Sequence, residues 1–350
     1  MNPLTSTRAP QGHWLLQAAG MSLLINKRGT YAGLLLSAAI VVVALASLSL
    51  GASAIPLPQV LAALAGSGDP IHVFMLQELR LPRLGAGLLS GAALGVGGCL
   101  LQTLARNRLA TPGIIGIDDG ATAFAVASIV AIPTSLAPPA LALIGATTAA
   151  ALAFGLGGGG SHGYRFIVVG IAVGALFGAI TNFMLARSDI DAANLAYPWT
   201  VGSLNARSSS TVLLLAGSLA VCLPIAKVLG RQLQLLRFSD AVAVGLGAQV
   251  QRTRLVVLLV TVVLTATAVA VAGPVGLVSL AAPEVARHLT RHRGVPVIGS
   301  ALAGALLMIA ADWVGRTAFA PVEIPVGVIT AIVGGPYLLW ILLRDPRRTA

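Results

Sequence analysis

The chain has 350 residues, of which 57% are hydrophobic and only 9% are charged. Soluble domains carry roughly a quarter of charged residues, so this composition excludes an ordinary soluble enzyme or binding module. The net charge of +11 does not indicate nucleic-acid binding, because the basic residues are spread over alternate loops between hydrophobic segments. The sequence therefore predicts an all-α integral membrane protein.

Nine hydrophobic segments are long enough to cross a bilayer, since about 30 Å of hydrocarbon takes roughly 20 apolar residues in a helix. They lie at 31–50, 81–105, 113–132, 137–156, 164–186, 210–229, 252–272, 297–317 and 325–343. A tenth, shorter apolar segment lies at 274–286. We expect about ten transmembrane helices, with both chain ends on the same side of the membrane.

Basic residues set the expected orientation. We expect a cytoplasmic segment at 1–30, one transmembrane domain at 31–343 and a cytoplasmic tail at 344–350, in the cell inner membrane. Lys and Arg prefer cytoplasmic loops, and this arrangement leaves few of the 22 basic residues outside. Segment 188–209 is expected to include a short interfacial helix on the outer face. The outer arginines are Arg80, Arg83, Arg187, Arg207 and Arg316.

Three of these outer arginines cluster at helix ends. Arg80 and Arg83 flank Leu-Pro at the start of segment 81–105, and Arg316 ends segment 297–317. Cations against the orientation rule indicate an acidic partner protein. The alternative is that they reach lipid headgroups or pair inside the chain. The candidate carboxylates for such pairs are Glu78, Asp312 and Glu323.

The polar stretch 102–120 lies between two apolar segments, and it is either a cytoplasmic turn or the inner gate of a pathway. Asp118 and Asp119 follow near the start of the next helix, where stabilisation of the helix N-terminus is favoured over a functional role. His288 and His292 have a spacing that suits a metal, but the arginines around them favour a solvated basic loop. We expect no metal site and no cofactor.

No phosphate-binding loop is present in the sequence, since the glycine-rich run at 155–163 lacks the Gly-Lys-Ser/Thr ending and is interpreted as a cytoplasmic turn. Any ATP that drives transport must therefore bind to another chain. Cys99 and Cys222 lie singly in apolar segments, which indicates neither a disulfide nor a zinc site. No catalytic constellation is visible, so the chain is not expected to be an enzyme.

Several motifs occur together in a fixed order. They are Arg80-Leu-Pro-Arg83; Gln102 with Asn107, Leu109, Pro112-Gly113 and Gly116; Gly273-Pro-Val-Gly276 with Pro283 and Arg287; Ala311-Asp312 with Arg316; and Glu323-Ile-Pro-Val-Gly327 followed by Gly334-Gly-Pro336. With these motifs the chain resembles, from about residue 80 to 344, the permease subunits of type II ABC importers for ferric siderophores, haem and cobalamin, the FecCD/BtuC type.

The resemblance implies ten helices per subunit and a set of partners. These are a second permease subunit, identical or homologous, two ATP-binding subunits, an extracytoplasmic substrate-binding protein and membrane lipid. It favours the interpretation of Arg80, Arg83 and Arg316 as docking residues for the binding protein. It also implies an ATPase-coupling segment at about 231–251, with Ser239, Asp240, Gly245 and Gly247. The candidates for the pathway or its gate are Gln102, Asn107, Pro112, Gly113 and Gly116.

The sequence departs from the family pattern at a few positions. Ser239-Asp240 stands where Gly-Glu is usual, and the pair Asp118-Asp119 replaces small polar residues. Arg108 stands where Pro is usual, and Glu284 where His is usual. These changes either tune a dedicated ATPase or mark one half of a heterodimer.

The stretch from Trp199 to Arg207 most resembles the ferric-siderophore branch, especially permeases for catecholates. We therefore expect import of a ferric siderophore, with cobalamin or haem import as the alternative within the family. An ion-coupled secondary transporter would need paired ionisable residues near the bilayer midplane, and a membrane anchor for a redox enzyme would need histidines deep in opposing helices. Neither pattern is visible.

Overall fold

The computed structural model describes residues 13–18, 21–51, 53–131, 136–157, 164–205, 209–290 and 294–343. Within these ranges the fold is helical apart from one antiparallel hairpin, β1 (His13–Ala18) with β2 (Met21–Asn26). The all-α prediction is confirmed for the transmembrane part. The expected positions Arg207, Arg291, His292, Arg293, most of the glycine-rich run and the tail 344–350 lie outside the described residues.

Ten helices correspond to the ten predicted spans. They are α1 (Lys27–Ser49), α4 (Leu81–Leu104), α5 (Ile117–Val130), α6 (Pro138–Leu156), α7 (Tyr164–Arg187), α9 (Ser209–Leu235), α11 (Val250–Ala272), α12 (Gly276–Thr290), α13 (Val297–Thr317) and α14 (Val326–Leu343). In the described part of the chain, seven helices are long and apolar enough to cross a membrane by themselves. With 14 and 15 residues, α5 and α12 extend only about 21–23 Å at 1.5 Å per residue.

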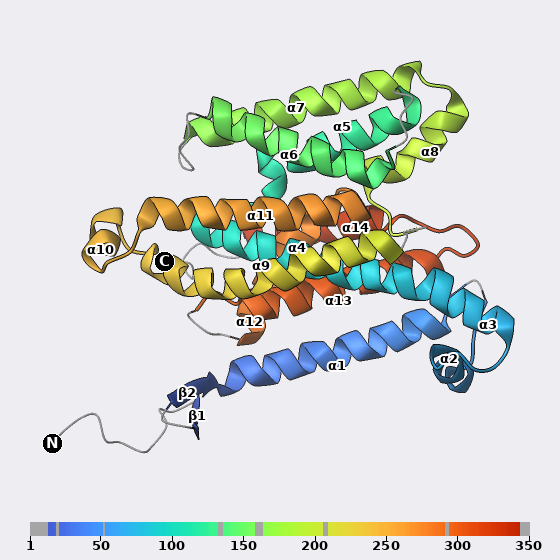
Figure 1. Cartoon of the computed structure of the whole chain (residues 1–350), viewed down its shortest axis with the longest axis horizontal. Helices are drawn as coiled ribbons and strands as arrows, with labels where there is room; N and C mark the ends of the chain where they lie inside the picture. Colours follow the sequence, from blue (N-terminus) through green and yellow to red (C-terminus); the bar gives the residue numbers. More distant parts are fainter. Residues whose placement is uncertain are drawn as a thin grey trace.

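Short helices mark the two ends of the bundle (Figure 1). One end, here the α8 end, carries α2 (Leu57–Leu64), α3 (Pro70–Phe74) and α8 (Ile190–Val201). The opposite end, here the α10 end, carries the β1–β2 hairpin and α10 (Asp240–Gly245). The helix predicted within 188–209 is present as α8. The sequence did not predict the hairpin, α2 or α3.

Small residues let the central helices approach closely. A Cβ atom added to Gly98 of α4 would lie 1.8 Å from the carbonyl oxygen of Ser279 in α12, and one added to Gly91 would lie 2.3 Å from that of Gly304 in α13. The backbones of α4, α12 and α13 are therefore in direct contact. Such contacts replace hydrophobic burial as the main source of helix association in lipid.

Helices α5 to α8 form a group of their own, drawn in green in Figure 1, beside α11. Gly120 of α5 and Gly145 of α6 face each other, and a Cβ atom on Gly145 would lie 2.1 Å from the carbonyl oxygen of Gly120. The buried side chains of this group, with Ile117 and Trp199 among them, pack against Leu258 and Val262 of α11. The α4–α13 core and the α5–α8 group therefore meet along α11.

Two predicted spans differ from the helices observed. The segment predicted at 113–132 is broken, because a 3₁₀ turn, η2 (Pro112–Ile115), precedes α5 and Gly116 between them has φ 80°. The segment predicted to begin at residue 81 continues backwards to Pro70 through a π-helical turn, η1 (Met75–Arg80). Pro82 follows directly, and its missing N–H group accounts for the change in hydrogen-bond register.

Candidate functional site

Arg80, Arg83 and Arg316 lie together at the α8 end, where α1, α4 and α13 meet. Arg83 donates from Nη2 to Asp312 Oδ1 (2.9 Å) and from Nη1 to Glu323 Oε2 (2.9 Å). Arg316 donates from Nε to Asp312 Oδ2 (3.2 Å). Asp312 is thus shared between two guanidinium groups, and the pairing inside the chain that the sequence left open is present.

The remaining donors of the cluster bind the end of α1. Arg316 Nη2 donates to the hydroxyl oxygen of Ser47 (2.6 Å), and Arg80 donates to the carbonyl oxygens of Leu48 and Ser53. The last carbonyl groups of a helix have no partner within the helix, so these arginines cap α1. They join α1 to α4 and α13.

Exposure differs sharply across this cluster. The side chains of Arg83, Arg316 and Asp312 are 14%, 9% and 7% exposed, whereas Glu323 is 45% exposed. Asp312 is therefore a fixed internal partner, because a buried carboxylate between two arginines cannot leave without stranding their charges. Glu323 is the carboxylate of this cluster that is open to solvent.

The predicted pathway residues occupy the last turn of α4, where Gln102 lies, and the loop and turn that follow α4 at the α10 end. Gln102 is buried, accepts a hydrogen bond from Arg287 Nη2 and donates one to the carbonyl oxygen of Leu280 (3.2 Å). It therefore ties the end of α4 to α12. Asn107 accepts from the N–H group of Leu109 (2.9 Å), which closes the turn before η2.

Gly116 fixes the position of the broken helix. Its φ of 80° favours glycine, and an added Cβ atom would lie 2.9 Å from the backbone nitrogen of Gly174 in α7. Pro112 begins η2, and an added Cβ atom on Gly113 would lie 2.8 Å from Asp118 Oδ2. The structure thus places these three candidates where α4, α5 and α7 come together.

Asp118 and Asp119 lie in the first turn of α5, as the sequence predicted. Asp118 Oδ1 is buried and has no hydrogen-bond partner among the described residues. A Cβ atom on Gly276, the first residue of α12, would lie 3.9 Å from Asp118 Oδ2. Asp118 therefore lies near the first residue of α12 as well as in the first turn of its own helix, α5.

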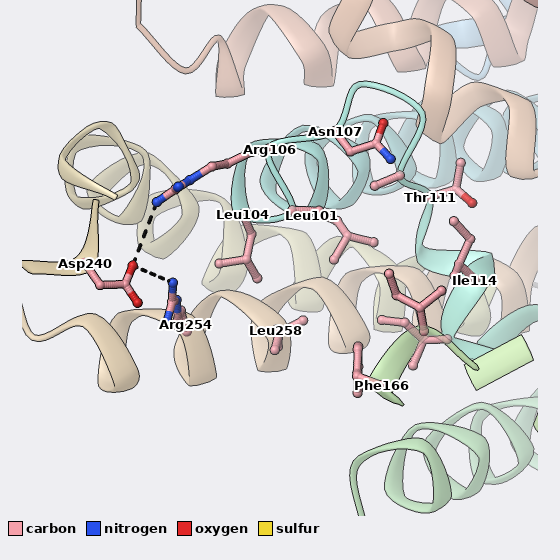
Figure 2. A pocket seen from close by; sticks show the side chains of 14 residues that line it. Leu101, Leu104, Arg106, Asn107, Thr111, Ile114, Phe166, Asp240, Arg254 and Leu258 are labelled. Carbon is pink, nitrogen blue, oxygen red and sulfur yellow. Dashed lines mark hydrogen bonds and ion pairs between the residues drawn. The ribbon is translucent and has the colours of Figure 1, made fainter. Parts of the chain in front are cut away.

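The predicted coupling residues lie on and around α10, and Figure 2 shows Asp240 among them with Arg106 and Arg254. Asp240 Oδ1 accepts a hydrogen bond from Arg254 Nη2 in α11 (2.9 Å) and lies 3.8 Å from Arg106 Nη2. Ser239 is the N-cap residue of α10 without a side-chain capping bond, and Gly245 is its last residue. Gly247, with φ 84°, turns the chain toward α11.

Arg106 carries the contact from α10 to α4. Its φ of 51° lies in the left-handed region, which is costly for a residue with a side chain. Its guanidinium group donates to the carbonyl oxygens of Leu236 (3.1 Å from Nε) and Phe238 (2.6 Å from Nη2), just after α9. The sequence predicted neither this role for Arg106 nor the pairing of Arg254. The only signal for Arg254 is that it is a basic residue in the first turns of an apolar segment.

A cavity of about 440 Å³ lies beside the pair of Asp240 and Arg254, between α4, η2, α7 and α11 (Figure 2). Apolar side chains of α4, η2, α7 and α11 form most of its wall, and Leu101, Phe166 and Leu258 are examples. Asp240 and Arg254 lie at its edge. On this side Asp240 of α10 is paired with Arg254, while Ala243 of the same helix is buried in the main hydrophobic core.

No cluster of three or more metal-ligating side chains occurs in the described ranges, and His288 lies near the end of α12.

Residues 39–344 match the FecCD transport family. The chain belongs to the FecCD transport family. This FecCD chain is therefore the permease component of an ABC importer, as the sequence predicted. In this family, ATP is hydrolysed by separate subunits.

Curated relatives align over most of their length. The chain is 36% identical over 326 residues to the ferric enterobactin transport system permease protein FepG of Escherichia coli (strain K12), which covers 93% of this chain and 99% of that protein. It is 36% identical to the Fe(3+)-citrate import system permease protein YfmE of Bacillus subtilis (strain 168), with 92% and 98% covered. It is 36% identical to the hemin transport system permease protein HmuU of Yersinia pestis, with 78% and 84% covered.

The fold also matches a solved structure. A metal-chelate type ABC transporter in an inward-facing conformation superposes with a TM-score of 0.81 at 25% identity, covering 90% of this chain and all of the other. The family resemblance, the fold class and the role in transport that the sequence predicted are thereby confirmed. The relatives include permeases for siderophore, citrate and haem, so they show transport of an iron compound as the shared role and do not select one chelate.

Proposed function

We propose that this chain is the permease subunit that carries a ferric siderophore across the cell inner membrane in an ATP-driven importer. The near-complete alignment with the ferric enterobactin permease, at 93% of this chain and 99% of that protein, carries the proposal. The ferric citrate permease aligns over nearly the same share of both chains and the haem permease over a smaller one, so the alignment supports a ferric chelate. The resemblance of the stretch from Trp199 onward to the siderophore branch points the same way.

In this proposal the α10 end faces the cytoplasm and both chain ends lie there. Basic residues support this orientation, since they are concentrated at the α10 end and cytoplasmic loops favour Lys and Arg. Those at the α10 end are Arg106, Arg108, Lys227, Arg231, Arg237, Arg252, Arg254 and Arg287. Those toward the α8 end are Arg80, Arg83, Arg187 and Arg316.

The α8 end then receives the substrate-binding protein through Arg80, Arg83 and Arg316. Because Glu323 is the exposed carboxylate on Arg83, an acidic residue of the binding protein exchanges with Glu323 while Asp312 keeps the arginines in place. Such an exchange keeps every charge paired throughout docking, which lowers the desolvation cost of the encounter.

The α10 end receives the two ATP-binding subunits. The segment 231–251 transmits their closure, with Ser239 and Asp240 at the start of α10 and Gly245 and Gly247 at its end. Asp240 is bonded to α11 and lies beside Arg106, so a displacement of α10 moves the loop that follows α4. Asn107, Pro112, Gly113 and Gly116 lie on that loop and its turn, and Gln102 lies in the last turn of α4 just before it. Together with those of a second permease subunit, these five residues form the inner gate.

Uptake of radiolabelled chelates tests the substrate assignment. The chain is expressed with its binding protein and ATPase in cells that lack other chelate importers. Ferric enterobactin and haem labelled with radioactive iron, and cobalamin labelled with radioactive cobalt, are supplied separately. We expect ATP-dependent uptake of the ferric catecholate and little of the other two. Uptake of haem or cobalamin in place of the siderophore would refute the substrate assignment and leave the importer assignment intact.

A further inference from the structure

A second cavity at the α10 end lies between the starts of α1 and α13 and the last turns of α9, and its volume is about 300 Å³. This Lys227 cavity has a wall of two kinds. One part is apolar and belongs to the start of α13, with Val297 and Leu302 among its residues. The other part is polar and belongs to α9, with Lys227, Arg231 and Gln234. The cavity thus offers positive charge beside apolar surface.

The α1 side of the Lys227 cavity is formed by two glycines. Gly29 and Gly33 line the cavity one turn apart. A Cβ atom added to Gly33 would have no atom of the described residues within 4 Å, and one added to Gly29 would contact Asn26 alone. On the opposite side α9 packs against the start of α13, since a Cβ atom added to Gly230 would lie 3.2 Å from Val297 Cγ2. Side-chain packing therefore leaves the space beside α1 unfilled.

The two cations of the Lys227 cavity lie close together. Lys227 and Arg231 are four positions apart in α9, so their side chains share one face of the helix. Both are exposed, and neither forms an ion pair or a hydrogen bond within the part of the chain that the structure describes. No aspartate or glutamate is among the described residues of the cavity wall. Like charges at this spacing repel each other, so an anion between them is stabilising.

Lys227 also lies near the level at which hydrocarbon gives way to lipid headgroups. It belongs to the apolar segment predicted at 210–229, and it lies eight positions before Leu235, the last residue of α9, about 12 Å along the helix axis. A basic side chain at this depth extends toward the headgroups. Val228 beside it is exposed, as are Leu34 and Leu35 of α1. The surface next to the cavity is therefore apolar, as contact with acyl chains requires.

We propose that the Lys227 cavity binds the headgroup of an anionic phospholipid, with its phosphate between Lys227 and Arg231 and its acyl chains along α1 and α9. Basic residues at the membrane surface attract anionic lipids, and charged donors form strong hydrogen bonds to phosphate. A zwitterionic headgroup also carries a cation, for which the described wall has no carboxylate. A free anion would make no use of the apolar part of the wall.

The leaflet of this lipid is the only part of the proposal that depends on the proposed function. In the orientation proposed above, the α10 end faces the cytoplasm, so the bound lipid belongs to the cytoplasmic leaflet. The cavity, its charges and its apolar wall are the same in either orientation.

Native mass spectrometry of the purified full chain tests the proposal. Phosphatidylglycerol or phosphatidylcholine is titrated into the chain in detergent, with and without its ATPase, and the affinity for the first bound lipid is measured. We expect phosphatidylglycerol to bind more tightly. Lys227→Gln and Arg231→Gln should each weaken its binding by about fivefold and leave phosphatidylcholine unchanged. Gly33→Leu should also weaken it, because the new side chain fills the cavity without a change of charge.

Arg252→Gln and Gly217→Leu are the matched controls for charge and for volume. Arg252 is an exposed arginine at the same end, Gly217 has open space around it in α9, and neither residue lines the cavity. Both variants should bind phosphatidylglycerol as the wild type does.

Three outcomes would overturn the proposal. The first is equal affinity for the two lipids, or wild-type affinity for phosphatidylglycerol in the Lys227, Arg231 and Gly33 variants. The second is displacement of the lipid by inorganic phosphate, which would show that the cavity takes a free anion. The third is loss of lipid binding when the ATPase is added, which would assign the cavity to that subunit. The assay contains no siderophore, substrate-binding protein or ATP, so its outcome is independent of the substrate assignment.

Discussion

Asp312→Asn should destabilise the protein strongly, because Asp312 is the only carboxylate that pairs with both Arg83 and Arg316 in the described structure. The side chain is 7% exposed and the two arginines 14% and 9%, so water replaces little of the lost interaction. Breaking a buried pair by removal of one partner costs about 3–5 kcal/mol. Asparagine keeps the volume of the side chain, so this cost comes from charge and not from a cavity.

Thermal unfolding of the purified chain in detergent measures this effect. For a chain of 350 residues, a loss of about 3–5 kcal/mol should lower the midpoint by roughly 4–7 °C. Glu323→Gln is the matched control, since Glu323 is 45% exposed and bonds Arg83 alone, and it should cost less than about 1 kcal/mol. Equal midpoints for wild type and Asp312→Asn would show that the arginine cluster does not hold α1, α4 and α13 together.

Three further predictions concern the surfaces and the helix contacts. In surface plasmon resonance at low salt, Glu323→Gln should speed association with the loaded binding protein and Arg80→Glu should slow it. Unchanged on-rates in both variants would show that the arginine cluster is not the docking site. Gly98→Ala should abolish folded protein in the membrane because the added carbon meets the backbone of α12, whereas Gly217→Ala, with open space around it, should accumulate normally by quantitative blotting. Asp240→Arg should reduce recovery of the ATPase in a pull-down far more than Asp240→Asn, because it adds a third cation beside Arg106 and Arg254; full recovery would place the coupling contact elsewhere.

The ten transmembrane helices could be predicted because a run of about 20 apolar residues has few alternatives in lipid. The break before α5 could not, since hydropathy does not distinguish a 3₁₀ turn at Pro112 from a continuous helix, and the φ of Gly116 depends on its contact with α7. The sequence does carry local signals for α3. Asp69 before Pro70 is a typical helix start, and in the structure the Asp69 side chain accepts a hydrogen bond from the N–H group of Ile71.

Long-range ion pairs were the least predictable part of the sites. Arg83 and Asp312 are 229 positions apart, and the sequence offered Asp312 only as one of several carboxylates. The pairs of Asp240 with Arg254 and of Arg108 with Glu284 depend on how α10, α11 and α12 pack, which no local pattern encodes. The sequence identified the charged residues at the candidate sites, whereas their ion-pair partners could be identified only from the packing of the helices.

Reconstituted transport tests the central claim most directly. The permease, its ATPase and its binding protein are assembled in proteoliposomes, and uptake of radiolabelled ferric siderophore is followed with and without ATP. The permease and ATPase together should import the chelate only when ATP and the loaded binding protein are both present, and the permease alone should neither hydrolyse ATP nor transport. Uptake driven by an ion gradient in the absence of the ATPase, or ATP hydrolysis by the permease alone, would contradict this account.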